Sequence, residues 1–194
     1  MKKLQILIGF LTIISYGFGQ KNIRTTIGFN SGTITPSTNT VSFEGKPGFQ
    51  FGLEGQFGKN IYFQPGIFYN IKNNTLNHPS LSIKKSELSI SSIRIPVSLG
   101  YRLYQNEDRK LGFYVFTGPS ISILSSIKHT ENNILTIGDN ELHDVEWTWS
   151  IGGGIDYKSF FMELGYEHGL TYTFLADNAK RKMFIFNFGY KLFF

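Results

Sequence analysis

The chain contains no cysteine among its 194 residues. This absence excludes a disulfide framework, a thiolate-bound metal and an acylated cysteine behind an export signal. Charged residues are also scarce, at 17% of the chain, and the formal net charge of +5 is a mild basic excess. Because no stripe of Lys and Arg runs along one face, we expect no nucleic-acid partner.

Long apolar runs are missing beyond residue 19, so no later stretch approaches the ~18 apolar residues that a membrane-spanning helix needs. The first residues differ: Lys2 and Lys3 are basic, residues 4–18 are mostly apolar, and Gly17 and Gly19 are small. This pattern predicts a signal peptide over residues 1–19 and one mature domain, an outer-membrane β-barrel, over residues 20–194. An uncleaved membrane helix is disfavoured because the apolar stretch is short and contains glycine.

Aromatic residues are plentiful, with 19 Phe and 10 Tyr, and they gather at alternate positions. In the last thirteen residues, 182–194, one parity is held by Phe184, Phe186, Phe188, Tyr190, Leu192 and Phe194. Successive side chains of a strand point to opposite faces, so one face of this segment is an aromatic band. A soluble protein would have to bury that band, whereas a membrane barrel can turn it towards lipid.

Eight segments alternate in this way, and most reach the roughly 9–11 residues with which a tilted strand crosses a bilayer. We predict strands over 23–32, 47–58, 61–71, 88–104, 111–125, 145–157, 160–174 and 182–194. Long polar connections (33–46, 72–87, 127–144 and 175–181) alternate strictly with short ones (58–60, 105–110 and 158–159). Short periplasmic turns and long external loops are typical of outer-membrane barrels.

The sequence therefore predicts an all-β fold, an eight-stranded antiparallel up-and-down transmembrane β-barrel in the cell outer membrane. A β-sandwich would alternate too, but its connections would follow no fixed rhythm.

The polar face of the predicted strands carries nine charged residues: Arg24, Glu54, Arg94, Arg102, Glu146, Asp156, Glu163, Glu167 and Lys191. The interior of an eight-stranded barrel is just wide enough for its own side chains. Charges buried there must pair, so we expect an interior charge network that fills the barrel. As an alternative, Glu163 and Glu167 near Arg94 and Arg102 would form a proton-active or ligand-binding cluster.

Residues that could carry other chemistry form no diagnostic pattern, so we expect no catalytic, cofactor or metal site. His129 and His143 flank a predicted external loop with four carboxylates, which we interpret as a solvated acidic loop. The chain has no G-x-S-x-G motif for a serine nucleophile. Basic residues in two predicted loops would contact lipopolysaccharide phosphates; they are Lys84, Lys85, Lys180, Arg181 and Lys182.

Four segments carry a family resemblance: RIPVSLGY at 94–101, FTGPS at 116–120, GGGIDY at 152–157 and LGYEHGL at 164–170. Together they resemble the PorT-like outer-membrane β-barrel family, over nearly the whole mature chain. Gly165 departs from the family pattern, which often has Arg at that position. The named member of the family assists a Gram-negative protein-secretion and gliding-motility machine, so the resemblance implies partners in a secretion apparatus.

We therefore expect a non-enzymatic integral outer-membrane protein that acts as a structural or interaction module through its external loops. The alternatives are a subunit that assists secretion, a small pore or ligand-binding barrel, and an outer-membrane enzyme acting on lipid or peptide. The expected partners are outer-membrane lipid, lipopolysaccharide and the barrel-assembly machinery, for which the resemblance implies Phe194 as the assembly signal.

Overall fold

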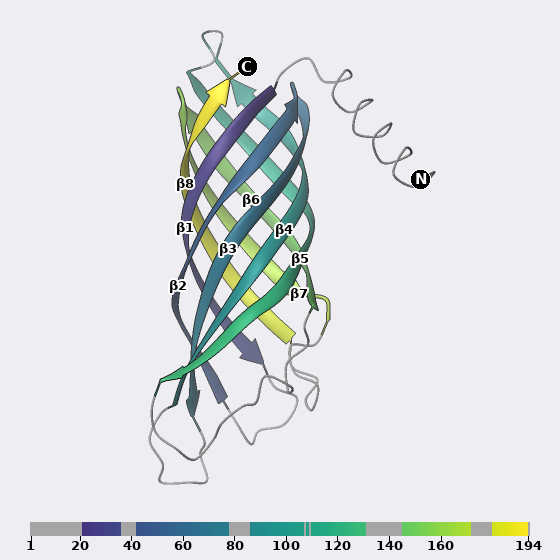
Figure 1. Cartoon of the computed structure of the whole chain (residues 1–194). Helices are drawn as coiled ribbons and strands as arrows, with labels where there is room; N and C mark the ends of the chain where they lie inside the picture. The colour runs from purple at the N-terminus through teal and green to yellow at the C-terminus, as the bar shows by residue number, and fades with distance from the viewer. Residues whose placement is uncertain are drawn as a thin grey trace, which may run out of the picture.

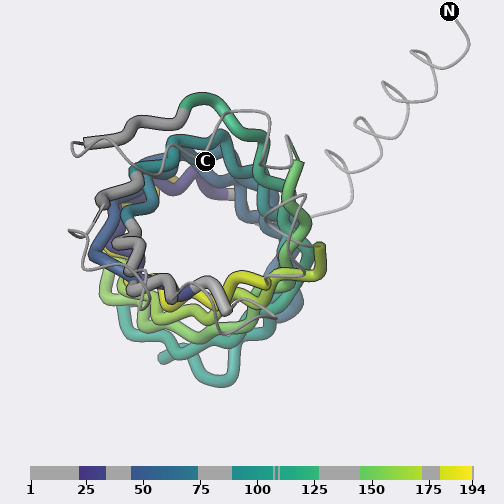
Figure 2. Tube along the Cα trace, turned by 90° about the horizontal axis from the view of Figure 1, so that it is seen from below, coloured from purple at the N-terminus to yellow at the C-terminus, as the bar shows by residue number. Residues whose placement is uncertain are grey.

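The computed structural model describes residues 21–35, 42–77, 86–106, 108, 110–130, 145–171 and 180–193. These residues form eight strands that close into one barrel, in which each strand is antiparallel to the next and β8 pairs with β1 (Figures 1 and 2). The strands are β1 (Lys21–Thr35), β2 (Ser42–Gly58), β3 (Ile61–Asn77), β4 (Ser86–Gln105), β5 (Leu111–Thr130), β6 (Val145–Tyr157), β7 (Phe160–Gly169) and β8 (Lys180–Phe193). The predicted eight-stranded antiparallel barrel is confirmed.

Buried and exposed residues alternate along the strands. In contrast to a soluble protein, the buried residues are mostly polar and the exposed residues are mostly apolar. In β8, Arg181, Asn187 and Lys191 are buried inside the barrel, while Phe184 and Leu192 are exposed on its outer wall. Closure leaves no strand edge, so the strands pair along their neighbours all around the barrel. An apolar outer wall with a satisfied backbone is what the hydrocarbon core of a membrane requires. None of the described residues belongs to a helix long and apolar enough to span a membrane.

The barrel has two unlike ends. Three short turns, β2–β3, β4–β5 and β6–β7, lie at the end where β1 begins and β8 ends, drawn uppermost in Figure 1. We call this the turn end, the opposite one the loop end, and the interior the lumen. Two turn residues have positive φ, Gly58 at 125° and Lys158 at 53°. Gly58 suits its position because glycine adopts such angles without steric cost.

At the loop end, several predicted strand boundaries are wrong. The strands β3 and β5 continue to Asn77 and Thr130, and β8 already begins at Lys180, so parts of the predicted loops belong to the sheet. In contrast, β7 ends at Gly169 and not at residue 174. The sheet extends further than the apolar pattern because the strands continue beyond the hydrocarbon region, where outward-facing positions no longer require apolar residues.

Some predicted features lie outside the described residues. They include the signal peptide over residues 1–19, the assembly signal Phe194, and residues 131–144, which hold His143 and most of the acidic loop. These expectations stay predictions.

Candidate functional site

The candidate site is the charged lumen of the barrel. The nine charged residues that the sequence places on the polar face are all buried there, at 8% exposure or less: Arg24, Glu54, Arg94, Arg102, Glu146, Asp156, Glu163, Glu167 and Lys191. Two further cations, Lys72 and Arg181, are buried with them. Within the described part of the chain, the lumen thus holds six buried cations and five buried carboxylates.

Arg24 on β1 is the centre of the network and is completely buried. Its Nη2 lies 2.5 Å from Oε1 of Glu163 on β7, and its Nε lies 3.7 Å from Oε2 of Glu54 on β2. The guanidinium stands over the ring of Phe161, 3.7 Å from the ring centroid. It also donates to Oε1 of Gln64 at 2.8 Å. Arg24 therefore joins strands from opposite sides of the barrel through one cation.

Both carboxylates beside Arg24 also accept hydrogen bonds from neutral groups. Glu163 accepts from the hydroxyl of Tyr114 at 3.0 Å and from the amide of Asn187 at 3.3 Å. Glu54 accepts from the amide of Gln64 at 3.0 Å and from the hydroxyl of Thr26 at 3.2 Å. Such multiply bonded carboxylates are held in place, which is typical of a structural network.

Nearer the turn end, three further charged residues form bonds close to the barrel rim. Lys191 forms a close ion pair with Asp156. Arg102 donates to Oε1 of Gln56 at 2.7 Å and to the backbone oxygen of Lys59 in the β2–β3 turn. These bonds anchor the turn to the lumen.

Nearer the loop end, Arg94 lies 3.1 Å from Glu167, and Lys72 and Arg181 converge on one carboxylate. Oε2 of Glu146 lies 3.2 Å from Nζ of Lys72 and 2.7 Å from Nη1 of Arg181.

Of the four residues of the alternative acid–base cluster, Arg94, Glu163 and Glu167 line one small cavity, and only Arg102 does not line it. Glu167 pairs with Arg94, whereas Glu163 pairs with Arg24, and Arg102 is bonded near the turn end.

Sequence reasoning missed Lys72 and Arg181 in the lumen, and it assigned both to loops. Arg181, expected in a basic surface patch, is only 4% exposed, while its neighbour Lys182 is exposed. A signal was available, because Lys72 continues the parity of Gln64 and Asn70, and Arg181 continues that of Met183. Extending the alternation past the apolar band would have found both residues.

Large aromatic rings fill the lumen near the turn end, opposite glycines. A Cβ atom placed on Gly100 would overlap the ring of Tyr62, and one on Gly154 would overlap that of Tyr114. Gly189 is covered in the same way by Phe161. A cavity of about 20 Å³ remains between Glu54, Arg94, Glu163 and Glu167 and their neighbours. That volume has room for about one water molecule.

Small hydroxyl side chains line the lumen nearer the loop end. Ser92, Ser120, Ser122 and Thr148 lie on three successive strands, β4 to β6, and are at most 3% exposed. Their hydroxyls have no hydrogen-bond partner within the described residues. Buried polar groups of this kind are commonly satisfied by water. Across the described ranges, no group of three or more His, Asp or Glu residues is placed to hold a metal ion.

A closed eight-stranded barrel with an apolar outer wall and a charged, self-filled lumen defines the class of small outer-membrane barrels. Residues 18–175 match the family model described as outer membrane protein beta-barrel domain, so the chain belongs to that family. The outer membrane is accordingly the location of this protein.

Solved structures agree with this fold. OprG from Pseudomonas aeruginosa matches with a TM-score of 0.56 at 12% identity, over 90% of this chain and 97% of OprG. Neisserial surface protein A matches with a TM-score of 0.50 at 11% identity, over 88% of this chain and 97% of that protein. At such identities the likeness concerns the fold alone. No functionally curated protein matches the chain in sequence.

Proposed function

We propose that this protein is a non-enzymatic, internally plugged outer-membrane barrel that acts as an interaction module through its external loops. The observation that carries the proposal is the lumen itself. Among the described residues, all five buried carboxylates lie within ion-pair distance of a buried cation. Large rings and the Arg24 cluster occupy the space between the walls. A transport path would instead need a continuous polar opening, for which wider barrels are suited.

Planar-bilayer recording tests the plug. We expect the purified barrel to give no stable single-channel currents. As a matched comparison, Tyr114→Ala combined with Phe161→Ala removes two rings beside Arg24 and should produce measurable conductance. Regular currents from the unaltered barrel would contradict the proposal and favour the small pore.

The external loops are the parts of such a barrel that can meet partners, because the wall faces lipid and the lumen is filled. Photo-crosslinking amino acids at single positions in segments 36–41, 78–85, 131–144 and 172–179 test this in intact cells. We expect defined crosslinked products from at least one segment. Positions in the short turns at Lys59 and Lys158 serve as controls on the opposite side of the membrane. Products from the turns alone would count against external interaction.

A role in a secretion apparatus is the second candidate, and the motifs that resemble PorT-like proteins favour it. They lie on β4, β5, β6 and β7, where residues such as Arg94 and Glu167 also build the lumen network. Co-purification from native membranes tests this candidate: secretion-apparatus proteins should accompany the barrel. Normal secretion in a deletion strain would exclude an essential role.

Membrane assembly and lipopolysaccharide contact complete the proposal. Phe194→Ala should lower the yield of heat-modifiable barrel, because the resemblance implies that assembly machinery recognises a terminal aromatic strand. Phe193→Ala is the control on the opposite parity.

Lys182 is exposed near the loop end and would contact lipopolysaccharide phosphates.

A further inference from the structure

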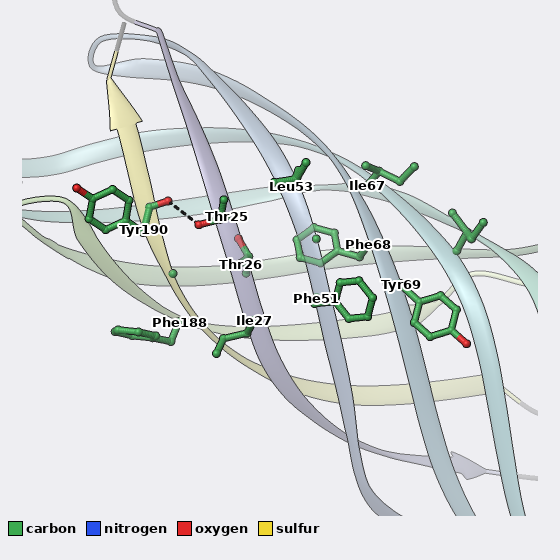
Figure 3. Close-up of a pocket in the computed structure, with 13 residues that line it drawn as sticks. Thr25, Thr26, Ile27, Phe51, Leu53, Ile67, Phe68, Tyr69, Phe188 and Tyr190 are labelled. Atoms are coloured by element: carbon green, nitrogen blue, oxygen red, sulfur yellow. Dashed lines mark hydrogen bonds between the residues drawn. The ribbon is translucent and has the colours of Figure 1, made fainter.

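The outer wall of the barrel is not evenly covered by large side chains. On β1, Thr25 is the small outward residue between Ile23 and Ile27, and its register neighbours are Tyr190 on β8 and Leu53 on β2. A groove of about 720 Å³ opens over Thr25 and continues across β8, β1, β2, β3 and β4 (Figure 3). We call this depression the outer groove.

Aromatic rings form firm walls on both sides of Thr25, as Figure 3 shows. On one side, Phe188 and Tyr190 both pack against Phe160, with centroid distances of 5.9 and 5.3 Å. On the other side, the rings of Phe51 and Tyr69 lie 5.5 Å apart. Because these rings brace one another, the groove is shaped before anything enters it, which lowers the entropic cost of binding.

The length of the outer groove suits one lipid tail. It crosses four strand-to-strand spacings of about 4.8 Å each, about 19 Å in total. One leaflet contributes about half of the ~30 Å hydrocarbon core, so an acyl chain lying obliquely matches this length. The groove also has a direction along the membrane normal. Thr25 lies close to the start of β1 at the turn end, whereas Ile93 lies far from the turn end of β4.

The two threonine hydroxyls at the centre of the groove are already engaged, so a headgroup would find no partner there. Thr25 donates its hydroxyl to the backbone oxygen of Tyr190 at 3.4 Å. Thr26 turns its hydroxyl into the lumen, where it donates to Glu54. The surface that remains is apolar, which favours a hydrocarbon occupant.

A second copy of the chain fits this surface poorly. Symmetric dimers bring the same patch of both subunits together. Two concave patches that face each other would enclose empty space and lose packing contacts. A flexible chain can instead follow the hollow.

We propose that the outer groove binds one acyl chain of a phospholipid from the leaflet on the turn side, with the headgroup at the turn end and the tail running towards Ile93. This site is separate from the lumen and from the external loops.

Native mass spectrometry tests the proposal on full-length mature barrel reconstituted in vesicles of phosphatidylethanolamine and phosphatidylglycerol and then released in mild detergent. The unaltered barrel should retain one phospholipid. Thr25→Phe fills the groove and should weaken retention about tenfold, the effect of losing roughly two methylene contacts. Val115→Phe is the matched control, because Val115 is exposed on the outer wall of β5 and does not line the groove.

Equal retention by Thr25→Phe and the unaltered barrel would overturn the proposal, as would the absence of retained phospholipid. A shift between monomer and dimer on Thr25→Phe, with lipid retention unchanged, would assign the groove to a second copy. Heat-modifiable mobility on electrophoresis verifies that each variant is folded.

Crosslinking tests the direction of the tail. A phosphatidylglycerol with a diazirine near the end of one acyl chain should label peptides that contain Ile93 or Tyr69 more than peptides from β5 and β6. Thr25→Phe should abolish this preference. Even labelling around the whole outer wall would overturn the proposed orientation.

Discussion

The two halves of the lumen are built on different principles. Near the turn end, the rings of Tyr62, Tyr114 and Phe161 lie against glycines of neighbouring strands, and the last two also flank Arg24. Near the loop end, the wall of β4 to β6 carries Ser92, Ser120, Ser122 and Thr148, whose hydroxyls have no protein partner within the described residues. The first half is filled by large rings, whereas small hydroxyl side chains line the wall of the second.

Charge is also distributed differently in the two halves. In the turn half, the carboxylates of Glu54 and Glu163 share Arg24. In the loop half, two cations, Lys72 and Arg181, share Glu146. Loss of Arg24 should therefore leave two buried carboxylates near the turn end without their shared cation. Loss of Lys72 near the loop end should leave Glu146 paired with Arg181.

The largest expected effect is that of Arg24→Met. It leaves Glu54 and Glu163 buried without their common cation, which should lower the free energy of unfolding by about 3–5 kcal/mol. Urea unfolding in phospholipid vesicles, followed by heat-modifiable mobility, measures this loss. Lys72→Met is the loop-half counterpart and should cost less than about 1.5 kcal/mol, because Arg181 remains beside Glu146. Equal losses of unfolding free energy in Arg24→Met and Lys72→Met would contradict the proposed difference in charge pairing between the two halves.

An intermediate effect is expected from bulk added to each half. Gly100→Val places methyl groups in the ring of Tyr62 and should cost about 1–3 kcal/mol. The same urea assay applies, and a second change, Tyr62→Leu, should recover part of the loss. Ser120→Val in the loop half removes an unpartnered hydroxyl and should change stability by less than about 1 kcal/mol. A larger cost at Ser120 than at Gly100 would show that the loop half is packed as tightly.

The smallest effect on stability, and the sharpest test of hydration, comes from single cysteines in this cysteine-free chain. Ser122→Cys should react with a small charged methanethiosulfonate added from the external side, because small side chains line this half of the lumen whereas large rings fill the other. Asn22→Cys, at a buried position near the turn end, should stay unlabelled under the same conditions. Mass spectrometry of the intact protein counts the adducts. Labelling of both cysteines would mean that the plug does not separate the halves.

The fold could be predicted because a transmembrane barrel repeats one rule on every strand. Alternation of apolar and polar residues assigned the faces, and the rhythm of connections assigned the topology. The boundaries at the loop end could not be found in the same way. There, strands leave the hydrocarbon region, and an outward-facing apolar residue is no longer required, so β3 and β5 continue without the signal that marks them elsewhere.

The sequence could predict which charged residues face the lumen, but not which of them form ion pairs with each other. Parity places Arg24 and Glu163 in the same lumen, but which cation meets which carboxylate depends on the stagger between strands around the whole barrel. Arg24 and Glu163 are 139 residues apart in sequence, and nothing local to either residue indicates the other. The groove over Thr25 likewise arises from residues on five strands.

The bond between Arg24 and Glu163 has a consequence for how the polypeptide reaches its native state. Contacts between residues so distant in sequence form late, because the entropy of a long intervening stretch of chain must be lost before the contact can stabilise the structure. Until the first and last strands meet, the guanidinium on β1 has no fixed counter-ion across the lumen. Completion of this single bond should therefore coincide with the rate-limiting event of folding.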